Sequence, residues 1–259
     1  MGFASGLLGI GGCFIMLPVQ FWVLPSMGVG DKLAILVAFG TNLMVVLPTA
    51  ASGAYRHHTK GAVLWEAAVV MGVTGALGSA FGAYVATLLP GQVLKVIFGA
   101  TILLGAVRML TARPPGAEER PPAGYRPYVL WGLPLGFAVG LVGIGGGVVM
   151  IPVMVIVLRF SMHRAVGTST AMMVFTATGG VVSYMVNGWG VEGLPEHSVG
   201  YVNLLQWALL AVTSIPMAQV GAHFAHRLPG RELRHIFIAV MVYVGLKMIG
   251  LFSWLGLPI

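Results

Sequence analysis

Two glycine-rich runs are the residues of this 259-residue chain best suited to bind a ligand without a charged side chain. The first contains Gly9, Gly11 and Gly12, and the second spans residues 143–147. Glycine permits backbone angles that other residues avoid, so either run can break a helix. The helix that follows a break, near Cys13 or Val148, directs free N–H groups and its positive dipole end at one place. We expect an anion there; close helix packing is the alternative role for such glycines.

Hydroxyl and amide side chains recur at matching places after the two runs. Thr41 and Asn42 correspond to Thr168 and Ser169, and Thr170 follows. Such groups can replace water around an oxyanion without adding a fixed charge. Hydrogen bonding between helices, or to a carbonyl of their own helix, is the alternative. The predicted substrate-binding set is Gly11, Gly12, Cys13, Thr41, Asn42, Gly145, Gly146, Gly147, Thr168, Ser169 and Thr170.

Ionisable residues within apolar segments form a second group of candidates. Arg108 and Lys247 lie late in equivalent segments, and Glu66 and His223 lie near segment ends. They could attract anions or exchange protons, and snorkelling to a membrane interface is the alternative. The lone Cys13 excludes an intramolecular disulfide. We find no nucleophile–base pair, metal-ligand cluster or paired carboxylates at membrane depth, so we expect no enzyme, cofactor or metal.

The composition indicates that these candidates lie in a membrane. Hydrophobic residues make up 58% of the chain and charged residues 8%, against roughly a quarter charged in a soluble domain. The formal charge of +7 comes from short loops between apolar blocks, which indicates orientation in a bilayer and not nucleic-acid binding. The apolar blocks cover about residues 2–24, 33–54, 62–89, 92–111, 129–158, 165–187, 201–224 and 233–256.

The chain is an internal duplication. Residues 2–18 align with residues 136–152, with 11 of 17 positions identical. A polar, proline-rich linker at 112–126 separates the halves. We therefore predict a first repeat at 1–111 and a second at 127–259.

The distribution of cations predicts how the halves are oriented. If all eight blocks cross the membrane, the Lys and Arg residues divide six against seven between its sides. If the first block of each half folds back at its glycines, 11 of the 14 fall on one side, which is a strong positive-inside bias. Each half then has a re-entrant or broken helix hairpin and three crossings. We predict an all-α polytopic membrane protein with inverted-topology repeats, a cytoplasmic linker and both termini on the non-cytoplasmic side.

The paired motifs resemble the TauE/SafE family of sulfite and organosulfonate transporters. Gly-Ile-Gly-Gly at 9–12 and 143–146 precedes Pro18 and Pro152, and Ala-x-Gly-Thr-[Asn/Ser] follows in each half. Leu-Pro-Gly turns recur at 89–91 and 228–230. The resemblance covers essentially the whole chain. It implies movement of a small sulfur-containing anion, sulfite or a sulfonate such as sulfoacetate, across the bacterial inner membrane.

The layout favours a secondary transporter that works outward by alternating access, as inverted-repeat transporters generally do. A passive anion channel would use the same residues without alternation, and a non-transporting membrane scaffold is a further alternative. The expected partners are the anion and the lipid bilayer, without nucleic acid. The sequence leaves open whether the working unit is a monomer or a homodimer.

Overall fold

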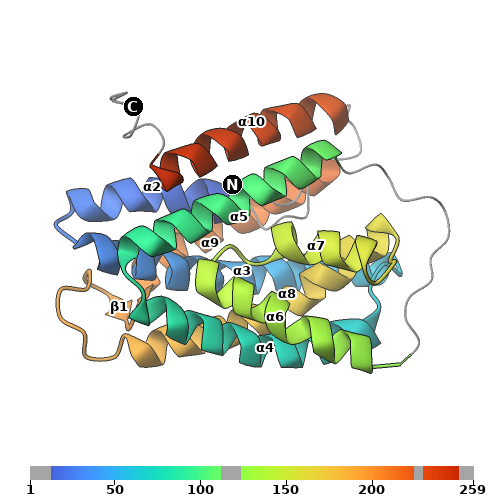
Figure 1. The fold of residues 1–259 in the computed structure, drawn as a ribbon, viewed down its shortest axis with the longest axis horizontal. Coiled ribbons are helices and arrows are strands. Elements are labelled where there is room, and N and C mark those ends of the chain that lie inside the picture. Colours follow the sequence, from blue (N-terminus) through green and yellow to red (C-terminus); the bar gives the residue numbers. More distant parts are fainter. Residues whose placement is uncertain (1–12, 112–123, 225–229, 251–259) are drawn as a thin grey trace.

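The computed structural model describes residues 13–111, 124–224 and 230–250, without the side chains of 13–15, 109, 162, 218–237 and 240 (Figure 1). The first half contains α2 (Cys13–Ser26), α3 (Asp31–Thr59), α4 (Trp65–Leu88) and α5 (Gly91–Thr111). The second half contains α6 (Arg126–Val142), α7 (Gly147–Ile156), α8 (Met162–Asn187), α9 (Leu204–Phe224) and α10 (Gly230–Ile249). One antiparallel pair of two-residue strands, β1 (Ser198–Val199) and β2 (Val202–Asn203), precedes α9. The expected all-α architecture is confirmed, and the strand pair is the one addition among the described residues.

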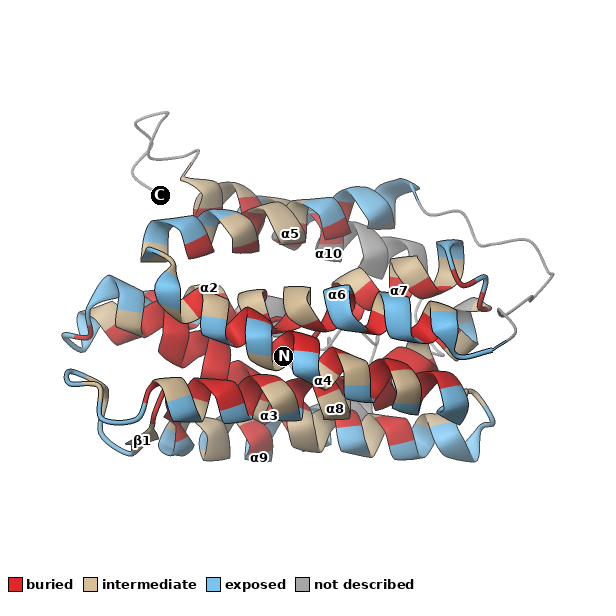
Figure 2. Ribbon diagram, turned by 60° about the horizontal axis from the view of Figure 1, so that its bottom comes forward, coloured by how far each residue is buried: buried red, intermediate tan, exposed pale blue. Residues whose placement is uncertain are grey.

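The outer surface of the helices suits a lipid environment. α3, α4, α5 and α8 are long and apolar enough to cross a membrane, whereas α6, α7 and the first part of α9 are shorter apolar helices. Large apolar side chains such as Leu77, Leu104 and Val212 are exposed, as lipid-facing positions would be. Figure 2 shows the buried residues concentrated on the inner faces of the bundle. The chain is a multi-pass membrane protein.

Small residues allow the helices of the bundle to approach closely. α4 packs most extensively against α6 and α8. A side chain on Gly78 or Gly82 would overlap backbone atoms of α6, and one on Gly136 or Gly140 would overlap backbone atoms of α4. This mutual fit is the packing expected of small residues repeated along membrane helices, where close backbone approach supplies the attraction.

The helix break at residues 143–146 separates α6 from α7. Gly143, Gly145 and Gly146 all have positive φ angles, of 67°, 77° and 90°, which residues with a side chain rarely adopt. α7 then runs back toward the end of the bundle at which α6 begins (Figure 1). The sequence places a break here, and α6 and α7 meet at it. The corresponding first run, with Gly11 and Gly12, lies outside the described residues.

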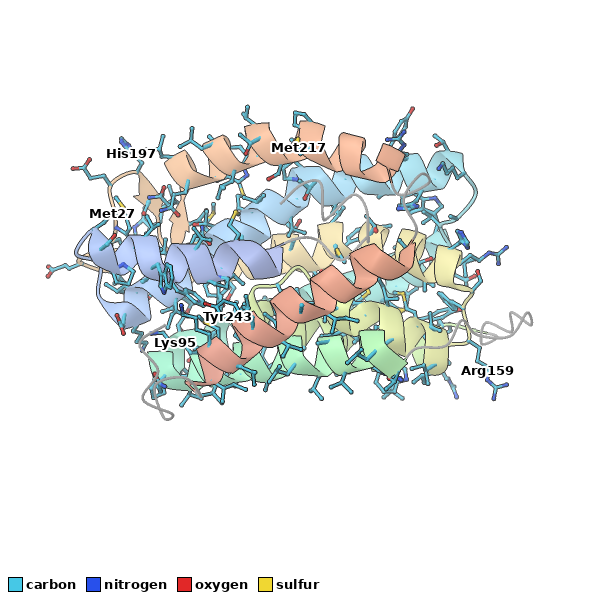
Figure 3. The ribbon with its side chains drawn as sticks, turned by 90° about the horizontal axis from the view of Figure 1, so that it is seen from above. Met27, Lys95, Arg159, His197, Met217 and Tyr243 are labelled. Atoms are coloured by element: carbon cyan, nitrogen blue, oxygen red, sulfur yellow. The ribbon has the colours of Figure 1, made fainter. Side chains whose placement is uncertain are left out.

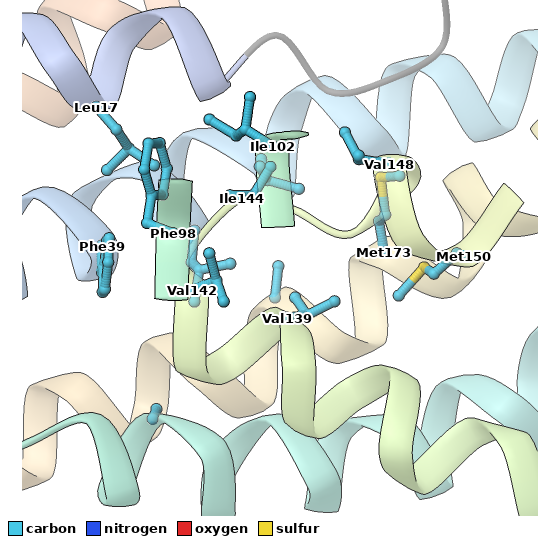
Figure 4. Packing of buried hydrophobic residues seen from close by; sticks show 14 of the residues in the cluster. Leu17, Phe39, Phe98, Ile102, Val139, Val142, Ile144, Val148, Met150 and Met173 are labelled. Carbon is cyan, nitrogen blue, oxygen red and sulfur yellow. The ribbon is translucent and has the colours of Figure 1, made fainter. Parts of the chain in front are cut away.

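An aromatic cluster packs beside this break. The rings of Phe21, Phe39 and Phe98 lie with centroids 5.8–6.2 Å apart, and Phe39 contacts the backbone at Gly143. Figure 4 shows Leu17, Phe98 and Ile144 within the same apolar cluster. Tight packing around the break leaves its backbone little freedom to move.

The two ends of the bundle differ in charge. The end that includes Arg159, which we call the arginine end, lies opposite Met27, Lys95 and His197 (Figure 3). The opposite end carries β1 and β2, and we call it the hairpin end (Figure 1). Helix termini and loops at the arginine end hold Arg56, Lys60, Glu66, Arg108, Arg126, Arg159 and Arg164. Those at the hairpin end hold Asp31, Lys32, Lys95, Glu192, Glu196 and Lys247.

Candidate functional site

The start of α7 presents buried N–H groups that have no acceptor in the described part of the chain. Residues 143–148 are all buried, and within the described ranges no hydrogen bond involves the N–H groups of residues 144–148. The carbonyl side of the break is better paired. Gly143 N donates to Val139 O at 2.9 Å, and the Tyr184 hydroxyl donates to Gly140 O at 2.9 Å. Since buried N–H groups are almost always paired, this surplus of donors suits an anion.

One face of α3 lies against the break. Phe39 contacts Gly143, and Val46 contacts Gly145. Asn42 is three residues after Phe39 and four before Val46, so it lies on the same helix face. It is fully buried, and its Oδ1 atom has no hydrogen-bond partner in the part of the chain that the structure describes. Of the polar candidates in α3, Asn42 is therefore the one beside the break.

Thr41 lies on another face of α3 and holds a segment of the second half. Its Oγ1 atom accepts a hydrogen bond from Asn203 N at 2.9 Å. A side chain on Gly40 would overlap the carbonyl oxygen of Tyr201, so glycine is needed for this approach. Gly40 and Thr41 thus fix the residues that lead into α9, at the hairpin end.

Thr168 makes the same arrangement in α8. Its Oγ1 atom accepts a hydrogen bond from Leu64 N at 3.0 Å, and a side chain on Gly167 would overlap the carbonyl oxygen of Ala62. This contact fixes the residues that lead into α4, at the arginine end. We call the two arrangements the Gly-Thr clasps. In each clasp, a Gly-Thr pair of one half holds the start of a helix of the other half.

Ser169 and Thr170 use their hydroxyl protons within α8. Both donate to Val166 O, at 3.0 and 2.7 Å. A hydroxyl that gives its only proton to a helix carbonyl has none left for an anion. This arrangement favours the alternative of bonding to their own helix.

A chain of three amides extends from the break to α9. Asn42 Nδ2 donates to Gln20 Oε1 at 2.8 Å, and Gln20 Nε2 donates to Gln206 Oε1 at 3.3 Å. Gln206 N in turn donates to Asn203 Oδ1 at 2.8 Å. Gln20, Asn203 and Gln206 are absent from the predicted set. The available signal was Gln20 itself, a polar residue on the otherwise apolar face formed by Leu17, Phe21 and Leu24.

The ionisable candidates lie away from the break. Arg108 and Glu66 are exposed at the arginine end. Lys247 Nζ lies 3.9 Å from the ring centroid of Trp22 at the hairpin end, where the contact is a cation–π interaction. The side chains of Cys13 and His223 lie outside the described part. In the residues that the structure covers, no group of three His, Cys, Asp or Glu side chains could hold a metal ion.

Comparison with known proteins identifies the family. Residues 1–248 match the family Sulfite exporter TauE/SafE. A probable membrane transporter protein of Methanocaldococcus jannaschii is 27% identical over 250 residues, covering 96% of this chain and 91% of the relative. One of Haemophilus influenzae is 26% identical over 247 residues, covering 95% and 93%. One of Xylella fastidiosa is 32% identical over 177 residues, covering 65% and 64%.

No solved structure matches the chain. The family match spans both halves and confirms the resemblance carried by the paired glycine and Gly-Thr motifs. Together with the apolar helices, the family match shows that the chain belongs to the TauE/SafE family of membrane transporters.

Proposed function

We propose that the chain carries a small sulfur-containing anion, sulfite or a sulfonate such as sulfoacetate, outward across the bacterial inner membrane. The observation that carries this proposal is the row of buried N–H groups at residues 144–148 that find no acceptor among the described residues. These donors and the positive end of the α7 dipole would replace the water around an oxyanion. The family description, which names sulfite export, supports this substrate class.

The orientation of the chain follows from its charged ends. Among the described residues, the arginine end holds six of the nine Lys and Arg side chains, and cytoplasmic loops are enriched in these residues. The arginine end would therefore face the cytoplasm, with the linker at 112–126 on the same side. Both termini would lie on the other side.

Alternating access would arise from two halves of inverted topology. Each helix runs opposite to its counterpart in the other half, α8 to α3, α9 to α4 and α10 to α5 (Figure 1), which supports this relationship. The Gly-Thr clasps add a second argument, because each half holds the other by the same contact at opposite ends of the bundle. Opening one clasp while the other stays closed would expose the break to one side of the membrane at a time.

Transport in liposomes tests the proposal. We expect the full chain, reconstituted in vesicles, to catalyse saturable sulfite flux that is accelerated by sulfite on the opposite side. Flux that does not saturate and shows no such acceleration would indicate a channel. Absence of flux for sulfite and for sulfoacetate would contradict the proposed function.

A further inference from the structure

Asn42 Oδ1 is a buried acceptor that has no donor among the described residues, and Asn42 lies on the face of α3 that packs against the helix break. Only one other side-chain atom in the described part shares this property, Ser79 Oγ in α4. Burying an unpaired polar atom is unfavourable, so its persistence at this place requires an explanation. Asn42 is fully buried on the face of α3 whose Phe39 and Val46 contact the glycines of the break.

The amide chain that holds Asn42 can run in two directions. As the structure has it, Asn42 donates to Gln20, which donates to Gln206. A side-chain amide has an NH2 donor and an oxygen acceptor of nearly equal size. Rotation of the last side-chain torsion by about 180° exchanges the positions of these two groups. If all three turn over, Gln206 donates to Gln20 and Gln20 donates to Asn42. Asn42 Nδ2 then becomes the free atom.

We infer that Asn42, Gln20 and Gln206 form a reversible amide relay that presents a donor to an anion at the break and an acceptor in its absence. The inference deepens the proposed function and rests on it. With an anion bound, the reversed relay pairs Asn42 Oδ1 with Gln20 and directs Asn42 Nδ2 toward the same place as the N–H groups of α7. With the anion bound, both amide atoms of Asn42 have a partner, whereas without it Asn42 Oδ1 has none among the described residues.

The relay also connects the break to the hairpin end. Gln206 lies in the first turn of α9, is half-buried, and its backbone N–H is bonded to Asn203 Oδ1. Asn203 is the residue whose N–H the Thr41 clasp holds. The reversal ends at the Gln206 side chain, and the Gln206 backbone N–H keeps its bond to Asn203 Oδ1. The relay therefore ends next to the segment that the clasp fixes.

The second half shows that the fold does not require an amide at the position of Gln20. The alignment of residues 2–18 with 136–152, extended by two residues, places Met154 opposite Gln20. Met154 is fully buried and fills the equivalent position with an apolar side chain of similar length. Gln20→Met is therefore a substitution of similar size that removes the relay and keeps the packing.

The test compares sulfite dissociation constants of detergent-purified full-length variants. We expect Asn42→Leu to raise the constant about tenfold, a loss of the size that one good hydrogen bond to a charged group provides. Gln20→Met keeps the Asn42 donor but removes the partner that polarises and holds it, so it should raise the constant by a smaller factor. The double variant should bind no more weakly than Asn42→Leu, because Gln20 acts on the anion only through Asn42. Ser79→Ala, which removes the other unpaired oxygen, should stay within twofold of wild type.

The outcomes separate the relay from the proposed function. If wild type binds neither sulfite nor sulfoacetate, the proposed function fails and the relay with it. If wild type binds and both single variants bind equally well, the relay alone is wrong. Losses that multiply in the double variant would also contradict it. Gln206→Met, at the half-buried end, repeats the test if Gln20→Met unfolds, and it should weaken binding in the same direction.

Discussion

The Gly-Thr clasps of the two halves have the same geometry and different surroundings. In both, a glycine admits a carbonyl oxygen and the next threonine accepts an N–H two residues later in the held segment. After Thr41 comes Asn42, which joins an amide chain, whereas after Thr168 comes Ser169, which bonds to its own helix. Duplication thus preserved the contact that joins the halves, whereas in the described residues an amide chain lies beside the Thr41 clasp and not beside the Thr168 clasp.

The largest effect should come from filling the glycines of the clasps. Gly40→Ala and Gly167→Ala each place a methyl group on a backbone carbonyl that cannot easily move. We expect each to lower the free energy of unfolding by about 3 kcal/mol, measured by chemical denaturation in detergent. Gly30→Ala is the control, because a side chain there meets no atom within 4 Å. Equal stability of all three variants would show that the clasps do not constrain the fold.

Removing the threonine hydroxyls should have the next largest effect. Thr41→Val leaves Asn203 N, and Thr168→Val leaves Leu64 N, without an acceptor. We expect Thr41→Val, whose hydrogen bond is buried, to lower the free energy of unfolding by about 2 kcal/mol. Thr168→Val, whose hydrogen bond is only partly buried, should lower it by about 1 kcal/mol. The matched Thr→Ser variants keep the hydroxyl and should lose less than half as much. A larger loss of unfolding free energy for Thr168→Val than for Thr41→Val would contradict the expectation that burial of the hydrogen bond sets its contribution.

The hydrogen bond of Trp207 to α3 distinguishes the surroundings of the Thr41 clasp from those of the Thr168 clasp. Pro48 has no N–H, so Met44 O lacks its usual partner within α3; Trp207 Nε1 donates to that oxygen at 3.0 Å. The position that matches Pro48 in α8 is Phe175, and no such donor is needed there. We expect Trp207→Phe to cost about 1 kcal/mol in unfolding free energy. Pro48→Ala should remove most of that loss in the double variant; additive losses would refute this role.

The smallest effect should distinguish the corresponding cations Lys247 and Arg108. Lys247 is partly buried over the Trp22 ring, so Lys247→Met should lower the unfolding free energy by about 0.5 kcal/mol. Arg108 is exposed, and Arg108→Met should leave thermal stability unchanged. A larger loss for Arg108→Met than for Lys247→Met would show that Arg108 makes the stronger stabilising contact, which would contradict the prediction.

The sequence predicted the elements better than the contacts between them. The break at residues 143–147 was predictable because adjacent glycines, with a matching run in the first half, are unusual inside an apolar block. The clasps were not predictable, since they depend on where residues 62–64 and 201–203 return to the bundle. For the same reason the hydrogen bond from Asn203 N to Thr41 Oγ1 was not predictable, and the place of Thr41 at the anion site stays a prediction. Gln20 and Gln206 form a pair only because α2 and α9 both lie beside α3.

A sulfur oxyanion that binds at the helix break should stabilise the purified protein against thermal unfolding, and a panel of anions measures this effect. The panel is sulfite, sulfate, thiosulfate, sulfoacetate, taurine and chloride at matched pH and ionic strength. A ligand at about a hundred times its dissociation constant adds about 2.7 kcal/mol to stability. We predict that one sulfur oxyanion or sulfonate raises the midpoint well beyond chloride. If no anion of the panel raises the midpoint more than chloride does, the break does not bind a sulfur oxyanion selectively.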